Sequence, residues 1–256
     1  MSPLLQAENV SKRFGGVQAL TDVDLGIERG EIYGLIGPNG AGKTTLFNAL
    51  TGIYPPDEGR FLFDGRPLSG LKAHQVAERG IARTFQNIRL FANLSALENV
   101  MIGRHVRTRS GVIGAVLRGR ANRDEEAAIE SRALELLEFV GIQSRANDQA
   151  GSLSYGDQRR LEIARALATD PKLLALDEPA AGMNAQETRA LKHLIEDIRR
   201  GGTTVLLIEH DVRLVMGVCD RVLVLDYGER IAEGPPAEIQ RNPRVIEAYL
   251  GGPLAA

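Results

Sequence analysis

The sequence predicts an α/β fold with a mainly parallel sheet, an antiparallel β subdomain and a helical subdomain. Three observations support this prediction. A strand, a glycine-rich loop and a helix follow one another around GPNGAGKTT at residues 37–45. The apolar runs at 172–178 and 203–210 lack alternation, as expected of parallel strands covered on both faces. Alternating segments at 4–10 and 19–27 open the chain and are typical of antiparallel strands.

The first elements form the predicted β layer. The two alternating segments are joined by a turn around Gly15 and Gly16. A strand at 31–37 then leads into the glycine-rich loop and a helix from Gly42 to about Leu50. Asp64 and Gly65 stand between FLF and RPL as a hairpin turn would. We therefore expect the chain to return to the β layer before residue 86.

The middle of the chain has helical character. Ser95 and Glu98 have the spacing of a capping box, which predicts a helix start at that point. Asn122 with Glu125 is expected to open a long helix that stops at Gly141. The section after Gln86 therefore predicts a helical lobe.

The last part of the chain returns to the sheet. An apolar stripe marks one face of a helix that is expected to end at Gly201 and Gly202, and it consists of Leu191, Leu194, Ile195 and Ile198. This helix lies between the two apolar runs and completes a second β, α, β unit. Residues 221–233 predict a hairpin, and residues 235–250 a short helical tail.

Composition and charge set limits on the function. The chain has 256 residues, enough for a substantial core in one large domain or two packed lobes. Its 31 Lys and Arg against 33 Asp and Glu give a net charge of −2, which provides no electrostatic reason to coat nucleic acid. Cys219 is the single cysteine, so we expect a reducing compartment and a buried, inert thiol. No signal peptide or membrane span is predicted, so a role at a membrane would need a partner.

Two motifs far apart predict a nucleotide site. GPNGAGKTT fits GxxxxGK[ST], in which backbone N–H groups surround a phosphate, Lys43 bridges the β- and γ-phosphates and the Thr44 hydroxyl reaches Mg²⁺. Thr45 is expected to bond the α-phosphate. In LSYGDQRRLEIARAL at 153–167, Ser154 and Gly156 stand at a predicted helix start, a second place for a phosphate. The chain therefore carries two half-sites for one ligand.

A pair of acids closes the first of the buried runs. Asp177 ends an apolar strand where a carboxylate can hold the metal shell, and Glu178 beside it can polarise the attacking water. An Asp-Glu pair by itself is usually a solvated loop. Here it follows buried residues at the carboxyl end of a strand, where ligands of open α/β sheets bind. We therefore interpret the pair as catalytic.

The ordered motifs resemble the ATP-binding cassette (ABC) ATPases of transporters across essentially the whole chain. They are the loop at 37, Gln86, LSYGDQ at 153, LLALDE at 173 and His210. The resemblance implies a P-loop NTPase core in a single domain over 1–256. Within it, 1–85 and 160–256 form the β subdomain plus a RecA-like core, and about 86–159 form the helical subdomain that carries the signature motif.

The resemblance also implies residue roles, with ATP and Mg²⁺ as the ligands. Gln86 touches Mg²⁺ or the water, His210 contacts the γ-phosphate and orients the water, and Phe14 stacks on the adenine ring. The catalytic set is Glu178, His210 and Gln86, and the metal set is Thr44, Gln86 and Asp177. The nucleotide-binding set is Phe14, Gly37, Pro38, Asn39, Gly40, Ala41, Gly42, Lys43, Thr44, Thr45, Ser154, Tyr155, Gly156 and Asp157.

In the family, the signature meets ATP bound by the opposite subunit, so a second cassette, identical or related, is implied. This chain departs from the commonest LSGGQ form at Tyr155 and Asp157. Gly156 remains where the backbone must approach phosphate. Asn184 stands where many cassettes carry aspartate, which leaves the bonding of that loop across the dimer open.

Longer strings resemble the ATP-binding subunit of branched-chain amino-acid importers. They include RTFQNIRLFANLSALENV at 83–100, DEPAAGMN at 177–184 and the tail NPRVIEAYLGG. The resemblance implies transmembrane permease subunits as partners, a solute-binding protein indirectly, no nucleic acid, and a peripheral position at the cytoplasmic face of the inner membrane. Cassettes for other solutes such as amides or urea share the pattern, and a non-transport regulatory cassette is the further alternative.

Two other classes of cassette fit poorly. DNA-repair and chromosome cassettes carry a very long coiled coil between the glutamine and the signature, and the interval from Gln86 to Ser154 is too short for one. Translation-factor cassettes usually carry two ATP sites in one chain, and this chain has one phosphate loop.

A basic segment is the last feature of the sequence. Between Glu98 and Asp124 there is no acidic residue, and the arginines there are Arg104, Arg107, Arg109, Arg118, Arg120 and Arg123. One interpretation is a solvated loop. The other is a surface that faces the permease or the anionic inner leaflet, where each nearby arginine contributes roughly 1 kcal/mol.

Overall fold

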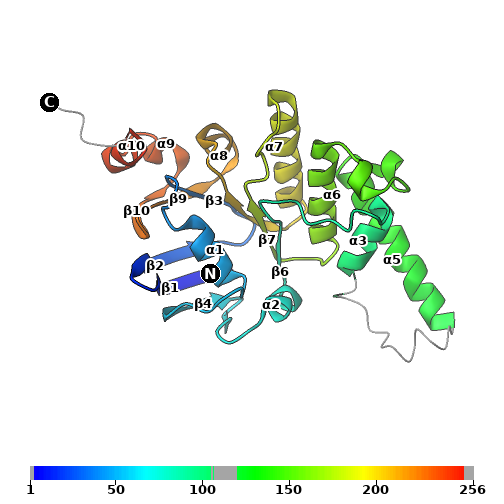
Figure 1. The fold of residues 1–256 in the computed structure, drawn as a ribbon, viewed down its shortest axis with the longest axis horizontal. Coiled ribbons are helices and arrows are strands. Elements are labelled where there is room, and N and C mark those ends of the chain that lie inside the picture. Colours follow the sequence, from blue (N-terminus) through cyan, green and yellow to red (C-terminus); the bar gives the residue numbers. More distant parts are fainter. Residues whose placement is uncertain (1–2, 105, 107–119, 251–256) are drawn as a thin grey trace. The chain divides into compact units, whose positions relative to one another are not determined.

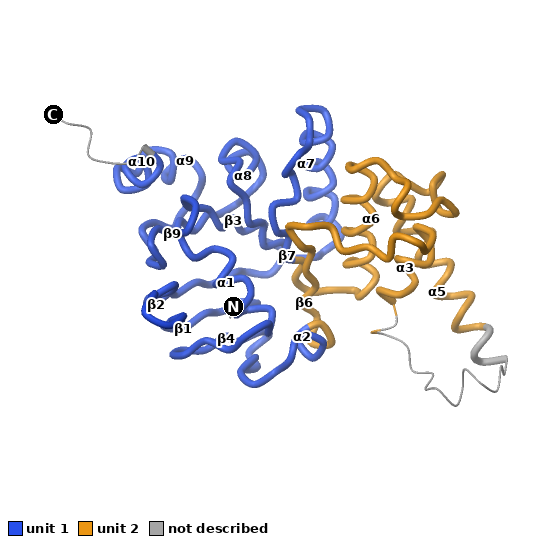
Figure 2. Tube along the Cα trace, viewed as in Figure 1, with its two compact units in different colours: residues 1–76, 175–256 blue, residues 77–174 orange. Residues whose placement is uncertain are grey.

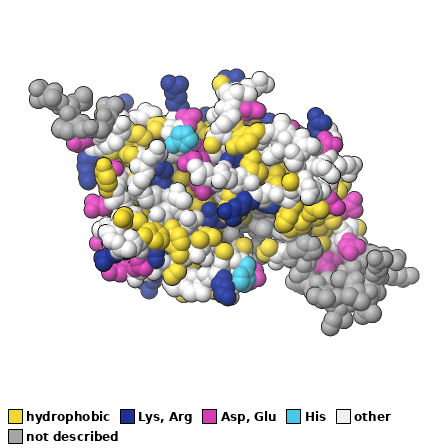
Figure 3. All heavy atoms as spheres, viewed as in Figure 1, with side chains coloured by type: hydrophobic (Ala, Val, Ile, Leu, Met, Phe, Trp, Pro, Cys, Tyr) yellow, Lys and Arg dark blue, Asp and Glu magenta, His cyan; other side chains and the backbone are white. Residues whose placement is uncertain are grey.

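The computed structural model describes residues 3–104, 106 and 120–250. The chain separates into two compact units, which Figure 2 shows in different colours. Unit 1 contains residues 1–76 and 175–256, and unit 2 contains residues 77–174. Acidic and basic side chains both occur on the face shown in Figure 3, in keeping with the net charge of −2.

The antiparallel sheet of unit 1 has the order β2-β1-β4-β5 (Figure 1). Its strands are β1 (Leu5–Phe14), β2 (Val17–Ile27), β4 (Glu58–Phe63) and β5 (Arg66–Pro67). The turn between β4 and β5 has positive φ at both Asp64 and Gly65, 52° and 71°, as a tight two-residue hairpin requires. The predicted β layer and its turns are confirmed.

The second sheet of unit 1 carries the parallel strands, with the order β10-β9-β3-β8-β7. They are β3 (Ile32–Ile36), β7 (Leu173–Asp177), β8 (Thr204–Ile208), β9 (Arg221–Asp226) and β10 (Glu229–Gly234), and β7 begins at the end of unit 2. β3 runs parallel to β8 and β9, and β9 and β10 form the predicted hairpin. All residues of β3, β7 and β8 are buried, which explains their unbroken apolar runs.

The helices of unit 1 include the predicted helix after the glycine-rich loop, the helix with the apolar stripe and the helical tail, together with one short helix after β8 that was not predicted. They are α1 (Lys43–Leu50), α7 (Ala185–Arg200), α8 (Val212–Val218), α9 (Pro236–Ile239) and α10 (Pro243–Leu250). The predicted apolar stripe of α7 is buried, and the helix ends at Gly201. α8 packs tightly on β3, because a Cβ on Gly34 would lie 2.8 Å from a Val215 methyl group. The short α2 (Ala73–Arg79) crosses the boundary between the units.

Unit 2 is mainly helical. It contains β6 (Ile81–Arg83), α3 (Ala96–Arg104), α5 (Arg120–Phe139), α6 (Tyr155–Leu167) and 3₁₀ turns at Gln143–Arg145 and Ala150–Ser152. Just before and at the start of β7, the N–H groups of Lys172 and Leu173 donate to the Gly80 carbonyl oxygen at 2.8 and 3.1 Å. α3 approaches α6 closely, because a Cβ on Gly103 would lie 2.3 Å from the Arg165 carbonyl oxygen.

The helix boundaries in unit 2 test two predictions. The capping box before α3 is confirmed, since the Ser95 N–H donates to Glu98 at 2.7 Å and the Glu98 N–H donates to Ser95 Oγ at 3.1 Å. The prediction that Asn122 opens the next helix is wrong, because α5 already begins at Arg120. Arg120 and Ala121 are strong helix formers, and they extend the helix past the capping signal. The helix ends before Gly141, whose φ of 78° stops it as predicted.

Candidate nucleotide site

The glycine-rich loop connects β3 to α1 and depends on glycine for its shape. Gly37, Gly40 and Gly42 have φ of 154°, 82° and 97°. A Cβ on Gly37 would lie 2.1 Å from the Leu225 carbonyl oxygen, and one on Gly42 would lie 2.6 Å from that of Ala19. A side chain does not fit at Gly37 or Gly42, so the shape of the loop depends on glycine at both positions.

Lys43 begins α1 and turns its amine back to the loop. Its Nζ donates to the carbonyl oxygens of Gly37 and Pro38 at 2.7 and 2.9 Å. Burial lowers the pKa of Lys43, and the charge of Glu178 opposes that shift. α1 has no acidic residue in its first turn and no side-chain cap, so the helix itself places no carboxylate at its positive end, where an anion would bind.

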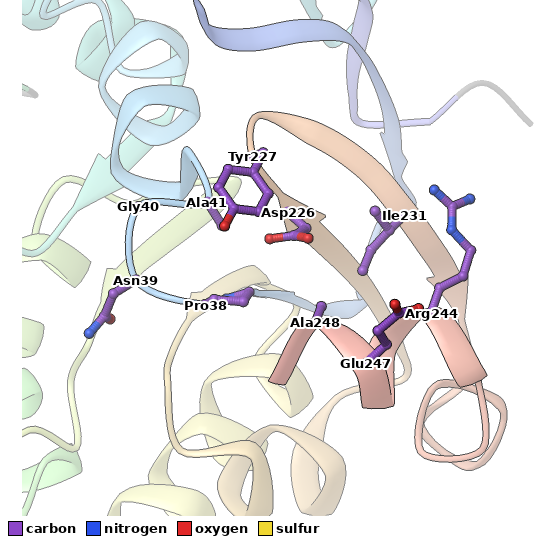
Figure 4. A pocket seen from close by; sticks show the side chains of 10 residues that line it. All are labelled: Pro38, Asn39, Gly40, Ala41, Asp226, Tyr227, Ile231, Arg244, Glu247 and Ala248. Carbon is purple, nitrogen blue, oxygen red and sulfur yellow. The ribbon is translucent and has the colours of Figure 1, made fainter. Parts of the chain in front are cut away.

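The loop also borders a cavity of about 390 Å³ on the side of α10. Figure 4 shows Pro38, Asn39, Gly40 and Ala41 on one side of it and Arg244, Glu247 and Ala248 of α10 on the other. Asp226 at the end of β9 and Tyr227 in the turn after it also line the cavity. Among the residues that the structure describes, none of those predicted to act in catalysis lines this cavity.

The structure brings Glu178 and His210 together within unit 1. Asp177 ends β7 and is 5% exposed, whereas Glu178 follows it with φ of 47°. The His210 Nδ1 atom lies 3.7 Å from a carboxylate oxygen of Glu178. The carboxyl ends of β7 and β8 therefore place an acid and an imidazole side by side, an arrangement that can accept a proton from water and orient it.

A residue that sequence reasoning missed lies beside this pair. Glu209 is 0% exposed, and its carboxylate accepts hydrogen bonds from the N–H groups of Ala180 at 2.8 Å and His210 at 3.2 Å. Burial raises the pKa of Glu209, and these backbone hydrogen bonds oppose the shift. Its only sequence signal is an acid directly between a buried run and the predicted His210.

Phe14 belongs to a small aromatic cluster. Its ring and the Tyr54 ring form an edge-to-face pair with centroids 5.3 Å apart and an interplanar angle of 86°. The Lys12 amine lies 5.5 Å from both ring centroids and forms an ion pair with Asp57 at 2.8 Å. The Tyr54 hydroxyl donates to the Thr45 carbonyl oxygen at 3.4 Å, which joins the cluster to α1. Phe14 is 46% exposed, so the ring has room for a stacking partner.

The second predicted half-site forms the start of α6 in unit 2. Ser154 is the N-cap, and its Oγ accepts from the Asp157 N–H at 3.2 Å and donates to the Asp157 carboxylate at 2.9 Å. Asp157 therefore completes the cap of this helix. Tyr155 is 45% exposed, and its ring lies 5.4 Å from the Arg159 guanidinium.

Gln86 lies in the same unit as this helix start. Buried Arg159 donates to the Phe85 carbonyl at 2.6 Å and also to the Gln86 carbonyl, and it pairs with Glu162 at 3.1 Å. Both side chains of that ion pair are 2% exposed. Within unit 2, the backbone at Gln86 is thus fixed to α6. The remaining predicted site residues belong to unit 1.

The departure at Asn184 and one arginine of the basic segment can now be placed. Asn184 caps α7 in a full capping box with Glu187, accepting from the Glu187 N–H at 3.0 Å. Arg104 of the basic segment forms an ion pair with Asp170 in unit 2. Arg107, Arg109 and Arg118 and the side chains of Arg120 and Arg123 lie outside the described residues, so neither interpretation of that segment is tested.

The described residues contain no group of three or more His, Cys, Asp or Glu side chains that could hold a metal ion. Thr44 and Asp177 nevertheless fit Mg²⁺, which binds proteins through one or two carboxylates together with substrate phosphates and water.

Cys219 is buried, as predicted, and burial raises the pKa of its thiol. Within the part of the chain that the structure describes, no helix has the length and apolar character needed to cross a membrane.

The fold and the site together define a P-loop nucleotide-binding ATPase. The phosphate loop follows β3, and an acid pair follows β7, which β8 separates from β3 in the sheet. Residues 20–181 match the family model described as ABC transporter, and residues 229–255 match the model described as branched-chain amino acid ATP-binding cassette transporter. The chain belongs to the ABC transporter family and is one of its ATP-binding cassette ATPases.

Individual relatives agree with this assignment. The chain is 48% identical over 250 residues to the high-affinity branched-chain amino acid transport ATP-binding protein LivG of Salmonella typhimurium, covering 97% of this chain and 98% of that protein. The crystal structure of the ADP conformation of an ATP-binding cassette of an ABC transporter has a TM-score of 0.85 and 32% identity, covering 98% of this chain and 100% of the other. A dimeric bacterial ABC transporter cassette has a TM-score of 0.77 and 28% identity, covering 91% and 98%.

Proposed function

We propose that this ATPase energises the import of branched-chain amino acids through a separate transmembrane permease. The observation that carries the proposal is the match of residues 229–255 to a family model for branched-chain amino acid cassettes. The likeness to a branched-chain amino acid transport protein over 97% of the chain supports it. A single cassette domain over 1–256, with 86–159 as its helical subdomain, is the unit we propose.

The residues of unit 1 suggest how the reaction proceeds. We expect the N–H groups of residues 37–45 and the Lys43 amine to hold the triphosphate, with Thr44 and Asp177 as protein ligands of Mg²⁺. When bound, Mg²⁺ neutralises phosphate charge. Glu178 accepts a proton from the attacking water, and His210, 3.7 Å from Glu178, orients that water against the γ-phosphate. Phe14 stacks on the adenine.

The proposed working unit contains two cassettes. The Ser154 cap at the start of α6 offers helix N–H groups, a hydroxyl and the Gly156 backbone to a phosphate. We propose that this surface meets the ATP held by a second cassette, whether a copy or a relative. Gln86 is proposed to touch the Mg²⁺ or the attacking water of its own cassette. The dimeric cassette to which this chain is similar makes such an assembly reasonable. ATP then joins the two cassettes, and hydrolysis releases them.

The remaining partners follow from transport. We propose that permease subunits hold the dimer at the cytoplasmic face of the inner membrane, that a solute-binding protein delivers the solute on the other side, and that nucleic acid has no part in the cycle. The solute is selected by those other subunits. An amide or urea is therefore the competing cargo.

The experiment isolates the protein with its attached subunits from native membranes and reconstitutes the complex in vesicles. Leucine, isoleucine or valine with the binding protein should stimulate ATP turnover in the wild type and leave Glu178→Gln near zero. Stimulation by an amide or urea alone would contradict the proposed cargo. Equal turnover by the wild type and Glu178→Gln would contradict the proposed catalytic role of Glu178.

A further inference from the structure

Glu209 is a fully buried acid that the proposed mechanism does not use. Its side chain is 0% exposed, although a charged carboxylate is costly to bury unless hydrogen bonds compensate it. The structure provides three such bonds, all from backbone N–H groups. The Glu209 carboxylate is therefore compensated by backbone donors of neighbouring residues.

The three hydrogen bonds come from two separate loops. One carboxylate oxygen accepts from Ala180, two residues after Glu178 in the loop that follows β7. The other oxygen accepts from His210 at 3.2 Å and Asp211 at 3.4 Å in the loop that follows β8. Glu209 therefore clamps together the two loops that present Glu178 and His210. All these residues belong to unit 1.

The loop after β7 needs such a clamp because its backbone is strained. Glu178 has φ of 47°, a left-handed conformation that a residue with a Cβ rarely adopts. Such conformations persist only where the surroundings fix them. The Glu178 N–H donates to the Ile208 carbonyl at 2.9 Å, and Glu209 holds Ala180 on the other side of the strained residue. Hydrogen bonds to Ile208 and Glu209 therefore hold the backbone at Glu178 and at Ala180.

The second loop is fixed in the same way. Glu209 binds the N–H groups of His210 and Asp211, and Asp211 in turn caps α8 by accepting from Arg213 at 2.9 Å. The imidazole itself is 60% exposed, and its Nδ1 lies 3.8 Å from Glu209 and 3.7 Å from Glu178. The backbone of His210, more than its exposed ring, is what Glu209 holds.

We infer that Glu209 is a positioning residue that sets the geometry of Glu178 relative to His210 by binding both of their loops through one carboxylate. This inference rests on the proposed catalytic roles of Glu178 and His210. Both carboxylate oxygens are needed, because each serves a different loop. A glutamine has one acceptor oxygen, and its NH₂ group would face a backbone N–H donor in one of the two loops.

The test compares Glu209→Gln with a matched control, Glu31→Gln. Glu31 is also a buried acid of unit 1, 7% exposed, and accepts from the Glu28 N–H at 2.7 Å at the start of β3. We expect Glu209→Gln to lower kcat at least tenfold while the Kd for ATP changes less than twofold. Glu31→Gln should leave both values within twofold of the wild type.

Two further variants separate positioning from a general loss of structure. Glu209→Asp keeps the charge and can still accept from the N–H groups of His210 and Asp211, but its shorter side chain does not reach Ala180. Its kcat should therefore lie between those of the wild type and Glu209→Gln. This variant also provides the test if Glu209→Gln does not fold. In a His210→Ala background, Glu209→Gln should lower kcat by a smaller factor than in the wild type, because part of its effect acts through His210.

The outcomes are distinct. The inference is overturned, and the proposed function stands, if the wild type turns over ATP and the folded Glu209 variants keep the same kcat. The result is the same if the ATP affinity of these variants falls as much as their kcat. An equal decrease of kcat by Glu209→Gln in the wild-type and His210→Ala backgrounds also overturns the inference. A wild type that does not hydrolyse ATP contradicts the proposed function, and this inference fails with it.

Discussion

Replacing Tyr54 should weaken ATP binding through the base and leave phosphate binding intact. Tyr54 and Phe14 form an edge-to-face pair at a centroid distance of 5.3 Å, and the 46% exposed Phe14 ring is the proposed adenine platform. Aromatic pairs of this geometry contribute about 0.5–1.5 kcal/mol. If Tyr54→Leu removes that support from the platform, the Kd for ATP rises about 2- to 13-fold, since about 1.4 kcal/mol corresponds to a factor of ten.

Isothermal titration calorimetry with ATP and with inorganic tripolyphosphate provides the assay. Tyr54→Leu should weaken ATP only, because tripolyphosphate has no base to stack. Tyr54→Phe keeps the ring and loses only the 3.4 Å hydroxyl contact to Thr45, so its affinity for ATP should change less than twofold. Phe139→Leu, at a 44% exposed aromatic residue of unit 2, serves as the control. Equal weakening of both ligands, or an unchanged affinity for ATP, would refute the reasoning.

Three other predictions concern the framework of the site. Gly42→Ala should lower the free energy of unfolding, measured in urea, by about 2 kcal/mol or more, because a Cβ there would lie 2.6 Å from the Ala19 carbonyl oxygen at a φ of 97°. As a control, Gly16→Ala should change that free energy by less than about 0.5 kcal/mol, because a Cβ on Gly16 would have no atom within 4 Å. Asn184→Ala should cost about 1 kcal/mol by removing the α7 cap, whereas Asn184→Asp should cost almost nothing, and equal losses would argue against the cap. Because burial raises the pKa of the Cys219 thiol, the reactive thiolate stays scarce as pH rises from about 7 to 9. Alkylation by iodoacetamide should therefore stay at least tenfold slower in native protein than in urea, and similar rates would show an accessible thiol.

Most of the fold could be predicted from the sequence because its signals are local. The buried runs that became β7 and β8, the apolar stripe of α7 and the capping box before α3 each follow from a short stretch of chain. α2 was not predicted, because Val76 is its only buried residue and no apolar period marks it. The start of α5 was misplaced because helix-forming residues precede the capping signal at Asn122.

The site was predictable to the extent that its residues stand in short motifs. The phosphate loop, the acid pair and the start of α6 carry such signals. Tyr54 was missed because its contact with Phe14 joins residues 40 positions apart, which no local pattern reports. Glu209 was missed because an acid after an apolar run predicts a solvated strand end. Only the structure shows that this carboxylate turns inward to two loops.

The most direct test of the account is a structure of the Glu178→Gln protein trapped with ATP and Mg²⁺. We predict two cassettes that enclose each nucleotide, with residues 37–45 of one and residues 154–157 of its neighbour contacting the same triphosphate. ATP held by a single copy, with no neighbouring cassette at its terminal phosphate, would contradict the account.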